Sequence, residues 1–438
     1  MAAPAPAPGA ADLIIEARTV VTPRGLLRDG AVHITDGIIS LVVGEHDGMD
    51  PFPEAEQRPL PDAGAASAFD ILVPGFVDMQ VNGIGAFDVA GACGEDWSRL
   101  DTLLLSQGVV AWCPTITSAP LDEMAAAHEA IKVAARRPDN PSQPRPNVAG
   151  AHIEGPYLTS AGAHVPEHLR RTVDLPAYLD ICDGAAIVTL APDVAGAPDA
   201  IAALANQGTV VSAGHSLCTA EEAARAFDAG ARLTTHLGNA MTGIHHRDIG
   251  LAGAALLDDR VTVCVIADLA HTSAGFIRLA YRLKGPDHFV GVTDAVAADA
   301  GTAGAIRVAT VSSDPRDPPV RTPVRSPATT AGCAGPEGPA VRPTTTGRHP
   351  VPLTAEGRLA GSVLTMPRAL ANLARECDIG LAAAARALSS VPARILGLEA
   401  NGDIREGYRA DLVALSAEDL SVEAVFIGGR PAYGPTRD

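Results

Sequence analysis

The chain has 438 residues, with 33 lysines and arginines against 51 aspartates and glutamates, for a formal net charge of −18. It contains no basic cluster of the kind that follows a phosphate backbone, so the composition argues against a nucleic-acid partner. The seven cysteines include no CxxC pair, which favours reduced core thiols over a disulfide framework. A chain of this length can form one large barrel with a small additional domain.

The first eleven residues are rich in alanine and proline. They lack the basic start and apolar core of a signal peptide, and the sequence has no apolar stretch long enough to span a bilayer. We therefore predict a disordered leader at residues 1–11, a cytoplasmic location and no membrane partner.

Short β-like runs occupy residues 13–43 and are separated by Asp-Gly turns at 29–30 and 36–37. Short apolar runs with glycine turns return between residues 402 and 430. The two ends of the chain are expected to pair. This pattern predicts a small β-sandwich domain formed by residues 12–72 together with residues 398–438.

From residue 73 onwards, apolar strand candidates alternate with alanine-rich helical stretches. Eight strand–helix units close a (β/α)8 barrel, so we predict an α/β fold with a TIM barrel over residues 73–397. Strands are expected at 75–81, 109–116, 148–153, 186–190, 209–213, 233–237, 261–267 and 289–293. Helices are expected at 125–135, 197–205, 219–229 and 276–283.

Residues 301–352 interrupt this pattern. They are rich in proline, threonine, arginine and glycine and have almost no apolar periodicity. Such a segment cannot bury enough surface to offset its ordering entropy, so we expect a low-complexity, disordered loop. A lid or an arginine-bearing arm are the alternatives, because the segment emerges directly from the eighth strand.

Polar residues stand at the carboxyl ends of several predicted strands, where (β/α)8 enzymes carry their chemistry. Glu154 ends the third strand, and His215 and His236 end the fifth and sixth. A buried carboxylate needs a cation, and one oxygen with two imidazoles suits Zn²⁺ or another divalent metal that activates water. Asp294, ending the eighth strand, is placed to take the proton from that water. The set predicts hydrolysis of a C–N bond.

Each of these residues also has an ordinary structural interpretation. A single histidine is more often a hydrogen-bonded barrel residue, and an Asp-Ala turn is more often a helix cap. Four such groups at the ends of strands three, five, six and eight favour the metal site, because that combination is much less expected by chance.

The motifs around these residues resemble those of the amidohydrolase superfamily and, within it, the N-acetylglucosamine-6-phosphate deacetylase family. They occur in the family's order over about residues 12–430, apart from 301–352. The most specific are His152-Ile153-Glu154-Gly155-Pro156, Gly214-His215-Ser216 and His236-Leu237-Gly238-Asn239-Ala240-Met241.

The resemblance implies a homodimeric hydrolase that removes the acetyl group of N-acetylglucosamine 6-phosphate, in amino-sugar catabolism or cell-wall recycling. Glu154, His215 and His236 match the ligands of one divalent ion per subunit, Zn²⁺ before Fe, Mn or Co. Asp294 matches the catalytic acid/base, and His164 matches the residue that polarises the amide carbonyl. The matched substrate contacts are Ala163, His164, Asn239, Ala240, Arg247, His271, Leu359, Ala360 and Gly361.

Arg247 is the matched phosphate contact that reaches into the neighbouring subunit's site. A guanidinium suits a phosphate because its fork donates two charge-assisted hydrogen bonds. Without the resemblance, Arg247 would be interpreted as part of a solvated loop beside His245 and His246.

Four residues depart from the family pattern. Gln80 and Asn82 stand where many amidohydrolases have a His-x-His pair that binds a second metal. Neutral amides are poor ligands for a dication, so we predict a single metal and a vestigial second-metal position. Leu269 and Gly238 replace residues usual beside the sugar. They leave open N-acetylgalactosamine 6-phosphate or another N-acetyl sugar as substrate, and a non-catalytic homologue is the remaining alternative.

Overall fold

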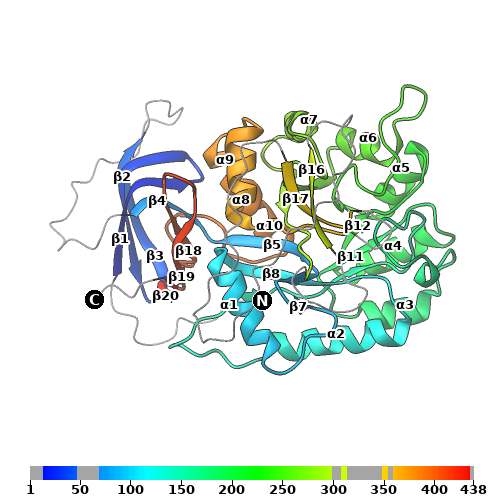
Figure 1. Ribbon diagram of the computed structural model, residues 1–438, viewed down its shortest axis with the longest axis horizontal. Helices are drawn as coiled ribbons and strands as arrows, with labels where there is room; N and C mark the ends of the chain where they lie inside the picture. The colour runs from blue at the N-terminus through cyan, green and yellow to red at the C-terminus, as the bar shows by residue number, and fades with distance from the viewer. Residues whose placement is uncertain (1–12, 47–68, 298–306, 313–347, 354–358, 435–438) are drawn as a thin grey trace.

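The computed structural model describes residues 13–46, 69–297, 307–312, 348–353 and 359–434 (Figure 1). The predicted leader at residues 1–11 lies outside these ranges. A barrel of parallel strands with helices around it forms the larger part of the molecule, and a small β-sheet lies beside it (Figure 1).

Eight parallel strands form the barrel, and each pairs with the barrel strand that precedes it in the sequence. They are β5 (Phe76–Val81), β8 (Val109–Ile116), β10 (His152–Glu154), β11 (Ile187–Leu190), β12 (Val210–Ala213), β13 (Leu233–Thr234), β14 (Thr262–Ile266) and β15 (Phe289–Val292). β9 (Asn147–Val148) adds to β8. All eight strands overlap their predicted positions, because an apolar run flanked by turns is a strong strand signal. The predicted fold class is confirmed.

Helices cover the outside of the barrel. They are α1 (Asp96–Ser106), α2 (Leu121–Ala135), α3 (Leu175–Cys182), α4 (Ala197–Asn206), α5 (Ala220–Ala229), α6 (Gly250–Leu257) and α7 (Ala274–Lys284), followed by α8 (Met366–Ala371), a π-helical turn (Asn372–Glu376), α9 (Leu381–Leu388) and α10 (Ser390–Ile395). The expected helices are present. The sequence did not predict α6, which is buried on nearly all sides and so has no amphipathic period. Among the described helices, none is long and apolar enough to cross a membrane.

The small domain is a seven-stranded sheet built from both ends of the chain. Its order is β20-β19-β18-β4-β1-β2-β3. The strands are β1 (Leu13–Thr22), β2 (Gly25–Thr35), β3 (Ile38–His46), β4 (Phe69–Pro74), β18 (Leu412–Leu415), β19 (Val422–Ile427) and β20 (Arg430–Tyr433). Side chains from both ends, such as Val20, Val32, Leu412 and Phe426, share a core separate from that of the barrel. The predicted pairing of the two ends is confirmed.

A β-hairpin occupies part of the segment that was expected to be disordered. β16 (Arg307–Ser312) pairs antiparallel with β17 (Arg348–Leu353). The expectation of disorder is wrong for these strands, while residues 301–306 and 313–347 lie outside the described ranges. The two strands are far apart in sequence, so no local turn signal announced the hairpin. Val351 and Leu353 are buried against Ala270 and Leu359, which attaches β17 to loops at the carboxyl ends of the strands.

The barrel is closed between β5 and β15 by side-chain hydrogen bonds and a few backbone hydrogen bonds, without a continuous ladder. Asp78 Oδ2 accepts a hydrogen bond from Thr293 Oγ1 at 2.5 Å, and its Oδ1 accepts from Thr293 N at 3.3 Å. Farther along, the backbone N–H groups of Asn82 and Gly83 donate to Ala295 O. Asp78 is fully buried, and burial raises its pKa to about 7 despite the bonds from Thr293.

We expect the substitution Asp78→Asn to change the pH dependence of stability. Because folding raises the pKa of Asp78 to about 7, its stabilising contribution is complete below the unfolded value of about 4 and is lost as pH rises through 7. As the pH rises from about 5 to 8, the free energy of unfolding of the metal-depleted wild-type protein should fall by on the order of 2 kcal/mol relative to that of Asp78→Asn. In the variant, an uncharged amide replaces the protonated acid, so its contribution does not change with pH. Thermal melts of both proteins across this range measure the difference. A difference in melting temperature that does not vary with pH would contradict the assignment.

Candidate metal centre

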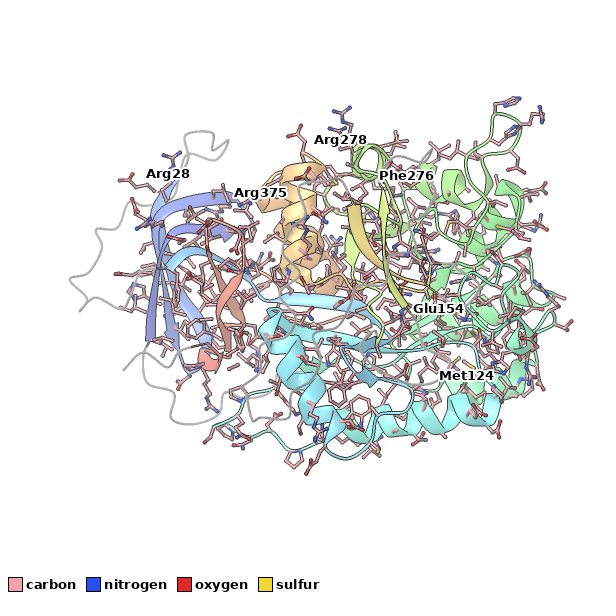
Figure 2. All side chains as sticks on the ribbon, viewed as in Figure 1. Arg28, Met124, Glu154, Phe276, Arg278 and Arg375 are labelled. Atoms are coloured by element: carbon pink, nitrogen blue, oxygen red, sulfur yellow. The ribbon has the colours of Figure 1, made fainter. Side chains whose placement is uncertain are left out.

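Three ligand-type side chains converge at the carboxyl ends of β10, β12 and β13. Glu154 is the last residue of β10, and His215 and His236 follow the ends of β12 and β13. Oε1 of Glu154 lies 3.0 Å from Nε2 of His236 and 3.3 Å from Nε2 of His215, and the two Nε2 atoms are 3.0 Å apart. All three side chains are buried, and Figure 2 labels Glu154 within the barrel.

The spacing of these three atoms fits a first-row divalent cation. With metal–ligand bonds of about 2.0–2.1 Å in a tetrahedral site, neighbouring ligand atoms lie about 3.3 Å apart. The separations of 3.0–3.3 Å are close to that value. Nδ1 of His215 donates to Ser160 O at 2.9 Å, so in the neutral ring the lone pair is on Nε2 and faces the cluster.

The electrostatics of the cluster also favour a cation. Burial alone would raise the pKa of Glu154, but the hydrogen bonds and charges of His215 and His236 hold that pKa well below its usual range. Burial would lower the pKa of His236, yet Glu154 raises it above the ordinary value. A buried carboxylate that draws a proton onto an imidazole also attracts a metal ion. The cluster is therefore suited to a single divalent metal.

His164 is adjacent, but its hydrogen bonding makes it a donor. Its Nε2 lies 3.7 Å from Oε2 of Glu154, and by distance alone Glu154, His164 and His215 also form a possible ligand set. However, Nδ1 of His164 accepts a hydrogen bond from Ser118 N at 3.2 Å. Burial, followed by the charge of His215, lowers the pKa of His164 to about 3, so the ring is neutral and carries its proton on Nε2. This tautomer offers an N–H group instead of a lone pair, which favours His236 as the third ligand.

Asp294 follows β15 and lies beside the same cluster. Its Oδ1 accepts a hydrogen bond from Asn82 Nδ2 at 2.7 Å. Burial raises the pKa of Asp294 to about 6, with the charge of His236 opposing this and that of Glu154 adding to it. A carboxyl group with this pKa can accept a proton near neutrality and return it.

The segment Leu359–Gly361 packs directly on Asp294. A Cβ atom at Gly361 would lie 2.7 Å from the backbone oxygen of Asp294, and the residue has a φ of +64°, so glycine is required on both counts. The neighbouring Ser362 N donates to Asp294 O at 2.8 Å. The matched substrate contacts Leu359, Ala360 and Gly361 are thereby placed at the mouth of the barrel.

Gln80 and Asn82 each direct an amide N–H toward a carboxylate. Gln80 Nε2 donates to Oε1 of Glu154 at 3.3 Å, just as Asn82 donates to Asp294. In these positions both amides act as hydrogen-bond donors, while Oδ1 of Asn82 is buried and has no hydrogen-bond partner among the described residues. The vestigial second-metal position remains a prediction.

Most other predicted substrate contacts lie around the cluster. Asn239 Nδ2 donates to His236 O at 3.1 Å, and His271 Nδ1 is 2.7 Å from Asp268 Oδ2. A Cβ atom at Gly162, the residue before Ala163, would lie within 3.1 Å of both Ala240 Cβ and the ring of His215. The backbone just before Ala163 therefore packs against Ala240 and His215.

Arg247 is a predicted substrate contact that lies away from the Glu154 cluster of its own subunit. Its hydrogen bonds are to neighbouring residues of its own loop. It lies on an exposed loop between β13 and α6 that projects beyond the helices (Figure 1). Its guanidinium is 3.1 Å from Nε2 of His246. Together with residues at the start of α5 it lines a surface hollow of about 430 Å³.

Backbone strain is concentrated at the site and was not visible in the sequence. His215, His236, Asp294 and Leu269 have φ values of 48°, 32°, 49° and 64°, in the left-handed region. For residues other than glycine this costs about 1–2 kcal/mol each and persists where the surrounding structure enforces it. Ser118 and Ser160 were also missed, because they act through backbone groups that carry no sequence signal.

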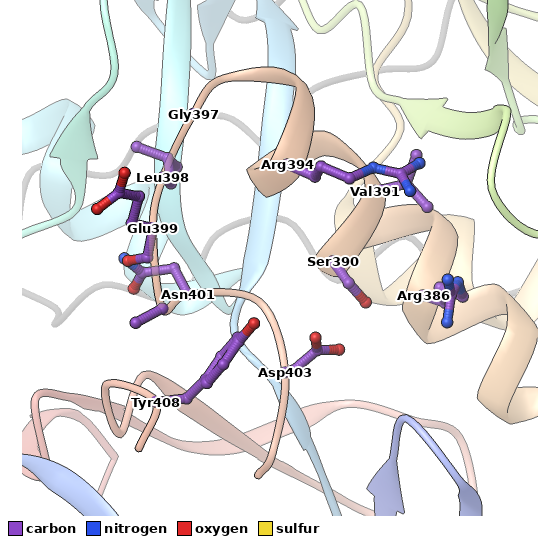
Figure 3. A pocket seen from close by; sticks show the side chains of 11 residues that line it. Arg386, Ser390, Val391, Arg394, Gly397, Leu398, Glu399, Asn401, Asp403 and Tyr408 are labelled. Atoms are coloured by element: carbon purple, nitrogen blue, oxygen red, sulfur yellow. The ribbon is translucent and has the colours of Figure 1, made fainter. Parts of the chain in front are cut away.

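A separate pocket lies between α9, α10 and the small domain (Figure 3). It measures about 290 Å³ and is lined by Arg386, Arg394 and Tyr408 among others. Both arginines form ion pairs with Asp287. Because its cations are already paired, this pocket is a weaker candidate for chemistry than the buried cluster.

Comparisons with known proteins agree with this geometry. The model of the amidohydrolase family matches residues 71–432. An N-acetylgalactosamine-6-phosphate deacetylase of Escherichia coli O157:H7 is 30% identical over 425 residues, covering 96% of this chain and 99% of its own length. An N-acetylglucosamine-6-phosphate deacetylase of Bos taurus is 32% identical over 392 residues, covering 85% and 86%.

Among solved structures, the chain resembles a mutant N-acetyl-D-glucosamine-6-phosphate deacetylase of Mycobacterium smegmatis in complex with N-acetyl-D-glucosamine 6-phosphate. The TM-score is 0.77 at 27% identity, covering 97% of this chain and all of that one. The likeness therefore includes both the barrel and the small domain.

Substitution can show whether His236 or His164 is the third ligand beside Glu154 and His215. We expect His236→Ala to lower the affinity for Zn²⁺ by at least about 100-fold, because it removes a lone pair from the cluster. His164→Asn should retain near-stoichiometric metal, because it removes only a neighbouring donor. Metal analysis of both variants after dialysis against a chelator of known affinity measures this. Retained metal in His236→Ala with loss in His164→Asn would show that His164 is the ligand.

Proposed function

The chain belongs to the amidohydrolase family and, within it, to the N-acetylglucosamine-6-phosphate deacetylases, and we propose that it hydrolyses N-acetylglucosamine 6-phosphate to glucosamine 6-phosphate and acetate. The observation that carries this proposal is the convergence of Glu154, His215 and His236 with the proton-accepting Asp294 and the N–H donor His164. The enzyme would act in the cytoplasm, in amino-sugar catabolism or cell-wall recycling.

Glu154, His215 and His236 would hold one divalent ion, for which we propose Zn²⁺, with Fe, Mn or Co as alternatives. When bound, such an ion supplies Lewis acidity, which lowers the pKa of water and polarises the acetyl carbonyl.

The protein's own groups move the protons. Asp294 takes a proton from the attacking water as the new C–O bond forms, and Asn82 holds the carboxylate in place for that transfer. Nε2–H of His164 donates to the carbonyl oxygen, on which negative charge develops. Asp294 then returns the proton to the sugar nitrogen as the C–N bond breaks, so that the amine and acetate leave.

The phosphate would be bound at the edge of the mouth. We propose that Asn239 and Ala240 contribute from the loop after β13, and that Arg247 contributes from the partner subunit of a homodimer. Its exposed position on a projecting loop supports that role, since an arginine there can donate a bidentate pair to a phosphate outside its own barrel. His271 and Leu359–Gly361 would contact the sugar.

N-acetylgalactosamine 6-phosphate is the second candidate substrate. It is favoured by the likeness to the Escherichia coli relative, which spans 96% of this chain, and by Leu269 and Gly238. Initial rates of acetate release from the two sugar phosphates, with unphosphorylated N-acetylglucosamine as the control, decide between them. The main proposal requires the highest kcat/KM on N-acetylglucosamine 6-phosphate, and a higher value on the galactosamine epimer would transfer the assignment to that sugar.

We expect Asp294→Asn to reduce kcat by at least about 1,000-fold while leaving metal content unchanged, because the amide cannot accept the proton from water. The pKa of about 6 for the carboxyl group predicts that wild-type kcat/KM rises with pH through about 6, as Asp294 becomes ionised, and a bound cation would move this limb toward lower pH. Steady-state kinetics with metal analysis on the same preparation measure both effects. Substantial turnover in a metal-loaded Asp294→Asn variant would exclude this role.

Arg247→Ala should raise KM for the sugar phosphate by about 10-fold to 100-fold with little change in kcat, because a charge-assisted contact to phosphate is lost. The control is the unphosphorylated sugar, whose kinetics should not change.

Mixing subunits tests the arrangement across the dimer. If Arg247 acts in the partner's site, co-refolded Arg247→Ala and Asp294→Asn chains should regain activity, because one site of each mixed dimer is intact. Activity no higher than that of the separate variants would place Arg247 in its own subunit's site.

A further inference from the structure

A chain of buried polar groups runs across the barrel beneath the metal centre. Nδ1 of His152 lies 3.0 Å from Met79 O, and its Nε2 lies 2.7 Å from Thr189 Oγ1. Thr189 Oγ1 is 2.6 Å from Thr235 Oγ1, which is 2.6 Å from Ser212 Oγ. The four side chains are 0–2% exposed. This layer is polar where the interior of a (β/α)8 barrel is usually filled with branched apolar side chains.

The hydrogen bonds of this chain have one direction. A carbonyl oxygen only accepts, so Nδ1 of a neutral His152 donates to Met79 O, and its Nε2 must accept from Thr189. Thr189 then accepts from Thr235, and Thr235 accepts from Ser212. The hydroxyls of Thr189 and Thr235 therefore each have a donor on one side and an acceptor on the other, and Ser212 is the terminal donor. Such a network tolerates little displacement of the strands that it joins, because moving one of them breaks a buried hydrogen bond.

The strands that lead to Glu154, His215 and His236 each contribute one member of this hydrogen-bond chain, and β5 contributes the carbonyl that accepts from His152. Met79 precedes Gln80 on β5, His152 is on β10 with Glu154, Ser212 is on β12 before His215, and Thr235 immediately precedes His236. Thr189 is the link on β11, which lies between β10 and β12 and supplies none of the predicted ligands.

Thr189 also touches the backbone next to a ligand through its methyl group. A Cβ atom at Gly214 would lie 2.9 Å from Cγ2 of Thr189 and 3.1 Å from Cβ of Thr235. The backbone at Gly214, one residue before His215, therefore packs directly on both side chains. His215 and His236 both have left-handed φ values, a strain that requires support from neighbouring structure.

We infer that the hydrogen-bond chain Ser212–Thr235–Thr189–His152 positions the metal ligands by fixing how the strands that carry them are aligned along the barrel axis. Thr189 is its central link. The inference rests on the proposed metal-dependent hydrolysis. These residues do not touch the substrate; they act through Glu154, His215 and His236.

Two substitutions of Thr189 separate its hydroxyl from its methyl group. Thr189→Val keeps the shape of the side chain, but it leaves His152 Nε2 without a donor and the Thr235 hydroxyl without an acceptor. Thr189→Ser keeps the hydroxyl and loses the methyl contact with Gly214. The readout is the dissociation constant for Zn²⁺ of metal-depleted protein, measured by competition with a chromophoric chelator, together with the visible spectrum of the Co²⁺ form.

We expect Thr189→Val to weaken Zn²⁺ binding by about 10-fold to 100-fold and to alter the Co²⁺ spectrum, with kcat lowered and KM unchanged. Thr189→Ser should bind Zn²⁺ within about threefold of wild type. The matched control is Thr262→Val on β14, which removes a buried hydroxyl that also contacts a histidine, Nδ1 of His288 at 3.2 Å. It should lower the melting temperature without changing Zn²⁺ affinity.

Wild-type affinity in Thr189→Val would overturn the inference, and so would an equal loss in Thr189→Ser, which would assign the effect to packing. If Thr189→Val does not fold, Ser212→Ala at the open end of the chain takes its place: a severalfold weaker Zn²⁺ affinity supports the inference and an unchanged one overturns it. A wild-type protein that binds no metal or releases no acetate would instead refute the proposed function itself.

Discussion

The structure depends on one buried carboxylate. Glu154 lies at the end of a barrel strand with two imidazole nitrogens 3.0–3.3 Å from one of its oxygens. Leaving such a charge unpaired in the interior would cost several kcal/mol, whereas a divalent cation at the centre satisfies all three groups together. The positions of His215 and His236 follow from this demand.

The surrounding residues orient the two carboxylates, supply a hydrogen-bond donor and hold the barrel strands together. Gln80 and Asn82 donate to the two carboxylates and keep each in a defined orientation. His164 is fixed in one tautomer by a backbone N–H, which gives the site a directed donor beside the ligands. Asp78 joins the first and last barrel strands and so holds Asp294 opposite the cluster. Because the proposed ligands are on strand ends and not on long loops, their geometry is set by the barrel itself.

Much of this could be predicted from sequence, and the remainder has identifiable physical reasons. The barrel strands and the residues Glu154, His215, His236 and Asp294 were predicted, because buried apolar runs ending in polar residues are a strong local signal. The hairpin of β16 and β17 was missed, since its pairing is non-local and its composition is typical of disorder. The left-handed strand ends and the tautomer of His164 could not be predicted, because they depend on backbone partners that no residue pattern records.

We propose that Glu154, His215 and His236 together bind one cation. Anomalous diffraction from crystals of the purified protein, recorded on either side of the absorption edge of the metal it contains, tests this most directly. We expect one anomalous peak per subunit within about 2.2 Å of Oε1 or Oε2 of Glu154 and of Nε2 of both histidines. A second peak beside Gln80 and Asn82, or a single peak bound to His164 in place of His236, would contradict it.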